Sequence, residues 1–139
     1  MQKLTAEWVD KAEQDFHVVT MLTRGHQRLH DQVCFHCQQC AEKYLKALLQ
    51  ELGVPVPRIH NLLALRTLLL PYYPLLRPTV RGLKFLSRFA VGPRYPDYSA
   101  TKRQAAAALR WASRVRDACR GVLGIKPSRP RRRKLRDTP

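Results

Sequence analysis

The chain has 139 residues, and its formal net charge is +16 at pH 7 because 26 Lys and Arg side chains outnumber 10 Asp and Glu. This length fits one domain with one core. No stretch approaches the roughly 20 apolar residues of a transmembrane helix, and acidic residues near the N-terminus interrupt the apolar run that a signal peptide requires. We therefore expect a cytoplasmic protein with reduced thiols, without a membrane anchor or structural disulfides.

The positive charge is concentrated in the second half of the chain. Residues 1–57 carry six basic and seven acidic side chains, whereas residues 58–121 carry thirteen and two, and residues 122–139 carry seven and one. This asymmetry favours an anionic partner such as nucleic acid, a nucleotide phosphate or an acidic protein surface. Charge alone does not distinguish among these partners.

Two long amphipathic helices are predicted in the first half. Residues 5–24 repeat apolar side chains at three- and four-residue steps, with Thr5 as the expected N-cap and Gly25 as the stop. Residues 31–52 form the second pattern, which Gly53 and two following prolines end. The side of this second helix opposite its apolar stripe carries His36, Gln39, Lys43, Lys46 and Gln50.

The stretch VCFHCQQC raises the question of a metal site. Its cysteines, Cys34, Cys37 and Cys40, are separated by about 300° and 600° of helical rotation, so they do not converge on one point. A structural zinc requires four tetrahedral ligands. We predict that Cys34 and Cys37 pack in the core as small hydrophobic residues and that no metal binds. Cys40, near the edge of the stripe, is expected to be the thiol that reacts or contacts another subunit.

Shorter helices follow in the second half. Asn61 is a candidate cap for a helix that Pro71 ends, residues 79–90 form another, and the last helix is expected from about residue 99 to residue 120. Nothing alternates with period two. The sequence therefore predicts an all-α, antiparallel up-and-down bundle of four to five helices over residues 1–121.

Leucines are abundant between the third and fourth predicted helices. They outnumber the positions that one side of so short a segment can bury, which predicts a homodimer formed through helix faces. These residues are Leu62, Leu63, Leu65, Leu68, Leu69, Leu70, Leu75 and Leu76.

Residues 122–139 combine prolines with like charges, so they are predicted to form a disordered basic tail. Such a tail either keeps the protein soluble or acts as an electrostatic arm for RNA or an acidic partner.

Three separated motifs resemble the HEPN family (higher eukaryotes and prokaryotes nucleotide-binding). The first lies on the predicted second helix, the second is a His-Asn-Leu element and the third is an Arg-Tyr-Pro element before the last helix. The matching residues are Phe35, His36, Gln38, Gln39, Glu42 and Lys43; His60, Asn61 and Leu62; and Arg94, Tyr95 and Pro96. The resemblance covers about residues 5–121. It implies a bundle of four or five helices that commonly dimerises, a small nucleotidyltransferase partner in toxin–antitoxin-like pairs, and small residues where the cysteines stand.

The resemblance also raises the possibility of ribonuclease activity. Many relatives are metal-independent ribonucleases that use an arginine followed, after four to six residues, by a histidine. Here the arginine would be Arg94, but positions 99 to 101 hold Ser99, Ala100 and Thr101, so the mechanism lacks its base. Arg24 and His30 have the same spacing, but they span the predicted turn between the first two helices, which favours chance.

Two hypotheses remain. The missing histidine favours a noncatalytic, dimeric module that binds nucleotide, RNA or a nucleotidyltransferase; the alternative is a ribonuclease toxin with a displaced base. No cofactor is expected in either case. The candidate binding residues are His36, Gln39, Lys43, His60, Arg94, Tyr95, Asp97, Tyr98, Arg103, Arg110 and Arg114.

The chemistry of these candidates leaves alternatives open. Arg94 offers a planar fork suited to phosphate, and Tyr95 and Tyr98 can stack on a base, whereas Asp97 is expected to pair with Arg94 or to cap the last helix. The same segment can instead be a structural corner. His36 and Lys43 either line a nucleotide cleft or face solvent or a dimer partner.

Overall fold

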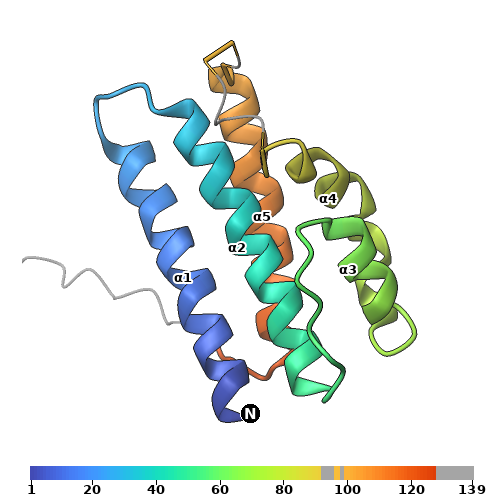
Figure 1. Ribbon diagram of the computed structural model, residues 1–139. Coiled ribbons are helices and arrows are strands. Elements are labelled where there is room, and N and C mark those ends of the chain that lie inside the picture. Colours follow the sequence, from blue (N-terminus) through green and yellow to red (C-terminus); the bar gives the residue numbers. More distant parts are fainter. Residues whose placement is uncertain (92–95, 98, 128–139) are drawn as a thin grey trace, which may run out of the picture.

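The computed structural model describes residues 1–91, 96–97 and 99–127 and consists of helices (Figure 1). Within this part of the chain no β-strand occurs, and the prediction of an all-α bundle is confirmed. The elements are α1 (Lys3–Arg24), α2 (His30–Glu51), α3 (Leu62–Leu69), the 3₁₀ helix η1 (Pro74–Thr79), α4 (Val80–Ser87) and α5 (Lys102–Val122).

Helix α2 is the centre of the bundle. It packs against α1 on one side and α5 on another, while the shorter α3 and α4 cover the remaining side (Figure 1). Its buried residues therefore point in nearly every direction, as in a helix surrounded by others. The fully buried side chains of α2 include Cys34, Cys37, Cys40, Ala41, Tyr44, Leu45, Leu48 and Leu49.

The start of α1 differs from the prediction. The helix begins at Lys3, its N-cap is Gln2, and no side chain caps it. Thr5 was expected as the cap, but it is fully buried and its hydroxyl donates a hydrogen bond to Glu51 Oε1 at 3.2 Å. The prediction was wrong because Thr5 faces the end of α2, which the pattern of α1 alone does not show.

The starts of α3 and α5 have clear side-chain caps. Asn61 Oδ1 accepts hydrogen bonds from the backbone N–H groups of Leu63 and Ala64 at 3.0 and 3.1 Å, which confirms it as the cap of α3. Thr101 and Gln104 form a capping box, so α5 begins at Lys102, three residues later than expected. The cap of α5 is thus Thr101, and the expectation that Asp97 caps this helix was wrong.

Helices α4 and α5 approach closely at one glycine. A Cβ atom added to Gly82 would lie 2.2 Å from Cε3 of Trp111. Only a residue without a side chain leaves room for the indole ring here, and this contact holds α4 against α5.

Most of the leucines between residues 62 and 76 are covered within the monomer. Leu62, Leu65, Leu69 and Leu76 are fully buried, whereas Leu68 and Leu75 are 43% and 50% exposed. Among the described residues, no helix combines the length and the apolar character that crossing a bilayer would require.

Candidate functional site

The predicted arginine stripe of α5 lies on the surface. Arg103, Arg110 and Arg114 are all exposed, in agreement with their seven- and four-residue spacing. The guanidinium carbon of Arg114 lies 4.9 Å from the centroid of the Trp111 ring, a cation–π contact that orients this side chain.

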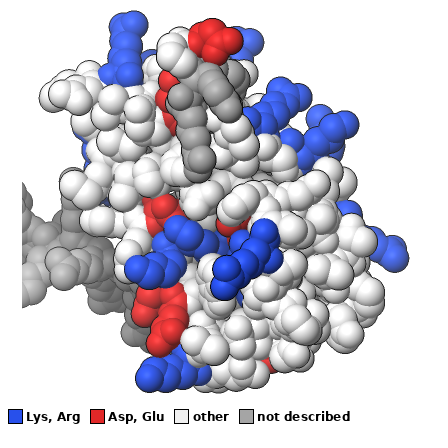
Figure 2. All heavy atoms as spheres, in the orientation of Figure 1, with Lys and Arg blue, Asp and Glu red and all other residues white. Residues whose placement is uncertain are grey.

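Helix α4 extends the basic surface beside α5. Arg81, Lys84 and Arg88 are exposed, and the sequence contains no Asp or Glu from residue 58 to residue 96. In Figure 2 the coloured side chains at the right-hand edge, on the side of α3 and α4, are all Lys or Arg. We call these three residues together with Arg103, Arg110 and Arg114 the basic face. Asp117 is the one acidic side chain on α4 and α5, so the charge of these two helices is strongly positive and attracts an anion.

The Arg-Tyr-Pro segment lies largely outside the described residues. Arg94, Tyr95 and Tyr98 lie outside the described residues, so their predicted role and the pairing of Asp97 with Arg94 stay predictions. Asp97 itself is exposed. The following turn is tied to α2, because the backbone N–H of Ala100 donates a hydrogen bond to Asp31 Oδ1 at 2.5 Å.

Asp15 organises the first part of the polar side of α2. His36 Nδ1 lies 2.8 Å from Asp15 Oδ1, and Lys43 Nζ donates to Asp15 Oδ2 at 2.5 Å. Asp15 is only 7% exposed, and both partners are half-buried. Of the alternatives left open for His36 and Lys43, a fully solvent-facing position does not hold, because α1 lies over this side of α2 and places a carboxylate among its own apolar positions.

Glu42 organises the second part. Its carboxylate, 3% exposed, lies 2.9 Å from His60 Nδ1 and accepts hydrogen bonds from Gln38 and Lys46 at 3.2 and 3.3 Å. Lys46, predicted to face outward, is 5% exposed and thus buried with its partner. Gln39 donates to Gln38 Oε1 at 2.7 Å. These contacts fasten the segment before α3 to α2, while the imidazole of His60 remains largely exposed.

A third carboxylate joins the first helix to the last. Glu13 accepts two hydrogen bonds of 2.7 Å from Arg116 and one of 3.0 Å from Arg120. Burial raises the pKa of Glu13, but hydrogen bonds from Arg116 and Tyr44 and the charges of both arginines outweigh it, so the pKa lies below its ordinary value. In the same pairing, the pKa of Arg116 is raised by its hydrogen bond to Glu13.

The cysteines are core residues. Cys34, Cys37, Cys40 and Cys119 are free thiols with no exposed surface. Burial, with a smaller effect of the Asp31 charge, raises the pKa of Cys34 to about 12, and burial raises the pKa of the other three as well. Core packing of Cys34 and Cys37 is confirmed. The prediction of a reactive edge position for Cys40 was wrong, because α1 widens the covered sector of α2.

No three His, Cys, Asp or Glu side chains come together as possible metal ligands in the part of the chain that the structure describes.

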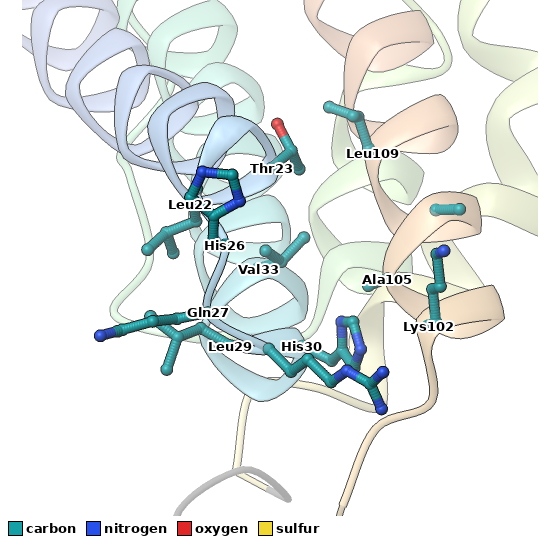
Figure 3. A pocket seen from close by; sticks show the side chains of 13 residues that line it. Leu22, Thr23, His26, Gln27, Leu29, His30, Val33, Lys102, Ala105 and Leu109 are labelled. Atoms are coloured by element: carbon teal, nitrogen blue, oxygen red, sulfur yellow. The ribbon is translucent and has the colours of Figure 1, made fainter.

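A pocket that the sequence did not reveal lies where α1 turns into α2, beside the start of α5. Its volume is about 560 Å³, and basic side chains from the turn and from α5 line it together with an apolar wall (Figure 3). The basic or titratable lining residues are His26, Arg28, His30 and Lys102. The basic residues of this pocket are visible in the segment RGHQRLH, but the sequence places Arg24 and His30 in a turn far from the last helix. The fold brings that turn to the first residues of α5.

The helical fold and the charge distribution define a small all-α bundle with a basic face on its last two helices. The family model of the HEPN domain matches residues 5–122, which is most of the chain. The protein therefore belongs to the HEPN domain family, as the three motifs indicated.

Two solved structures are similar over nearly their whole length. TT1696 from Thermus thermophilus is 25% identical, with a TM-score of 0.75, and the match covers 86% of this chain and 98% of that one. ST0689, an archaeal HEPN homologue, is 28% identical, with a TM-score of 0.66 and coverage of 91% and 100%. No curated protein matches the sequence.

Proposed function

We propose that this HEPN domain is a noncatalytic binding module for RNA or nucleotide, acting in the cytoplasm, where its thiols stay reduced. The observation that carries the proposal is the basic face of α4 and α5. Its six cationic side chains are exposed, with no acidic residue in the chain between positions 58 and 96. Phosphate neutralisation by such residues releases counterions and drives binding without requiring sequence recognition.

The absence of a histidine shortly after Arg94 supports binding rather than cleavage. Positions 99 to 101 lack the imidazole that the ribonuclease relatives place after their arginine. His36 and His60 each lie against a carboxylate within the bundle, at 2.8 and 2.9 Å. Both imidazoles thus take part in contacts that hold the bundle together.

The test compares binding and cleavage in the same samples. RNA should stay intact, and a gel shift should appear at low salt and fade as salt rises. The triple variant Arg103→Ala, Arg110→Ala, Arg114→Ala should weaken the shift at least about tenfold at low salt. A control variant that removes three exposed charges elsewhere, Lys3→Ala, Lys11→Ala, Arg58→Ala, should weaken it much less. If both triple variants behave alike, the basic face is not the contact surface.

Arg94 is expected to contribute to the binding of a specific nucleotide rather than to the nonspecific retention of RNA. Its change to Ala should weaken nucleotide binding while the low-salt RNA shift persists. If RNA and nucleotide both fail to bind at any salt, the basic face instead serves an acidic protein partner, and docking to a small nucleotidyltransferase, as in toxin–antitoxin-like pairs, becomes the better proposal.

A ribonuclease with a displaced base is the second candidate, and one observation favours it. His26 and His30 line the pocket beside the start of α5, so imidazoles occur near the place where the relatives' base would stand. Metal-independent RNA cleavage that disappears in both His30→Ala and Arg94→Ala would establish this second function and overturn the noncatalytic one.

We also propose that the protein acts as a homodimer. Leu68, Tyr72, Leu75 and Val80, which lie within thirteen residues of sequence, remain between 39% and 57% exposed, and such apolar side chains are suited to contact a second copy of the chain. Light scattering at micromolar concentration should report twice the chain mass of 16.1 kDa. A particle with the mass of one chain would contradict the dimer.

A further inference from the structure

We propose that the pocket between the α1–α2 turn and the start of α5 binds a nucleotide, with its terminal phosphate held at the basic rim and its base against the apolar wall. The inference deepens the proposed function and rests on it, because it assigns the nucleotide a place on the chain. The candidate site is separate from the arginine stripe of α5.

The rim is cationic and lacks internal partners. His26, Arg28 and Lys102 are exposed and His30 is half-buried, and none of these four side chains forms a hydrogen bond or ion pair with another described residue. In Figure 3 the side chains of His26 and Lys102 stand on opposite sides of the opening, with Val33 and His30 between them. An anion placed there would accept charge-assisted hydrogen bonds from more than one segment of the chain.

Four cationic side chains that pack between the helices give a contrast to the rim. Lys43, Lys46, Arg116 and Arg120 are each held by a carboxylate of the chain. The acidic residue nearest in sequence to the rim, Asp31, is not among the lining residues, and its Oδ1 is bound to the backbone N–H of Ala100. Arg28 and Lys102 therefore have no ion-pair partner among the described residues and are available to an anion from outside.

The start of α2 adds to the attraction. Its N-cap residue, Leu29, provides no side-chain hydrogen bond to the first turn, and Leu29 and His30 both line the pocket. The N–H groups of this first turn thus have no side-chain acceptor, and the positive end of the helix dipole favours an anion on this side.

The size and the wall of the pocket favour more than a bare phosphate. A volume of about 560 Å³ lies within the range of about 300–1,000 Å³ that small-molecule sites occupy. The apolar wall is formed by side chains from α1, α2 and α5, which can cover a planar base or a ribose. These residues are Leu22, Val33, Ala105, Ala106 and Leu109.

The test measures calorimetric binding of AMP, adenosine and inorganic phosphate to the full chain. AMP should bind more tightly than either fragment, because each fragment fills only one part of the pocket. Arg28→Ala and Lys102→Ala should each weaken AMP binding about tenfold, the effect of losing one hydrogen bond to a charged group. The matched controls Arg58→Ala and Lys11→Ala remove exposed charges far along the chain and should leave AMP binding unchanged.

A second variant tests the cavity itself without touching the charges. Ala106 is exposed on α5 and lines the pocket, so Ala106→Trp should fold normally, fill the space and abolish AMP binding. Unchanged AMP affinity in this folded variant would overturn the inference, as would equal losses in the rim variants and their controls.

Two further comparisons distinguish free nucleotides from RNA ends, and the pocket inference from the proposed function. If the pocket binds the ends of RNA, the change Lys102→Ala should weaken binding of RNA with a 5′-phosphate more than binding of RNA with a 5′-hydroxyl. Equal losses for the two RNAs would assign the pocket to free nucleotides. If RNA still shifts through the basic face but AMP does not bind, the pocket inference fails while the proposed function stands. If RNA fails to shift but AMP binds and responds to the rim variants, the pocket inference stands and RNA binding fails.

Discussion

The carboxylate of Glu13 on α1 forms ion pairs with two arginines of α5, the last helix. Its carboxylate holds Arg116 and Arg120, which are 103 and 107 positions away. The hydrogen bonds and charges of these arginines keep its pKa below the ordinary value of 4.5, despite the opposing effect of burial. The ion pairs are therefore fully formed above pH 4.5 and are lost as the pH falls through the folded-state pKa.

Because the pKa of Glu13 is lowered in the folded state, its contribution to stability should depend on pH. The wild-type protein should be more stable than Glu13→Gln at pH 7, and the difference should shrink as the pH falls below 4.5 and Glu13 becomes protonated, and so neutral like Gln. Urea unfolding at pH 7 and pH 3 measures it. The exposed Glu7, changed to Gln, is the control and should show little effect at pH 7. A gap between wild type and Glu13→Gln that widens at pH 3 would contradict the assignment.

The four thiols give a second prediction at this scale. Because Cys34, Cys37, Cys40 and Cys119 are fully buried and their pKa values are raised, a disulfide reagent such as dithiobis-nitrobenzoate at pH 8 should react with none of them in the folded protein. All four should react after unfolding in guanidinium chloride. Rapid native-state reaction of one thiol would show that the bundle opens locally at that residue.

Residue by residue, sequence patterns identified neutral core positions better than charged ones. The periodicity of α2 correctly placed Cys34 and Cys37 in the core, because the apolar stripe of one helix is visible in its own sequence. The burial of Lys43 and Lys46 was not visible, since it depends on Asp15 of α1 and on the neighbouring Glu42. A carboxylate within an apolar stripe, as at Asp15, is the available signal for such a pair.

At the scale of the helices, Gly82 and Trp111 define the contact between α4 and α5. Changing Gly82 to Ala would place a methyl group 2.2 Å from the indole ring. The ring or the helix must then shift, and we expect a net destabilisation of about 1–3 kcal/mol, the usual cost of overpacking. Thermal or urea unfolding measures it.

Gly121 in α5 is the matched control for this change. A Cβ atom at Gly121 would meet nothing within 4 Å, so Gly121→Ala should stabilise the helix by about 0.5–1 kcal/mol through its propensity alone. If Gly82→Ala is also stabilising, α4 is not held closely against α5 in solution.

The existence and type of every long helix followed from apolar period and from stop signals, but their boundaries did not. Thr5 and Ser99 were plausible starts by composition, whereas the actual starts depend on Glu51 and on the Thr101–Gln104 capping box. Which helices become neighbours was also beyond the sequence. The pocket at the α1–α2 turn was missed for this reason, since its second side comes from α5, some 75 positions later.

At the scale of the whole molecule, the positive charge is divided between the folded basic face and the C-terminal residues. Deleting residues 127–139 should leave the fold intact, because the last helix among the described residues ends at Val122. It should reduce low-salt RNA retention and flatten its salt dependence, since each lost phosphate contact lowers the slope by about 0.7 for a single strand. AMP binding should not change.

Gel shifts over a series of salt concentrations, together with circular dichroism of the truncated chain, check this prediction. A truncated protein that keeps the full salt slope would assign all phosphate contacts to residues 1–126. Loss of helicity on truncation would show instead that the terminal residues support the bundle.

The central position of α2 affects the folding of the chain during its synthesis. Ribosomes add about 5–20 residues per second, so about 3–10 s separate the synthesis of Glu51 from that of Lys102. During that interval α1 can already pair with α2, but the side of α2 that α5 will cover has no partner. We expect the nascent chain that still lacks α5, rather than the completed polypeptide, to be the species that chaperones bind and that aggregates when translation stalls.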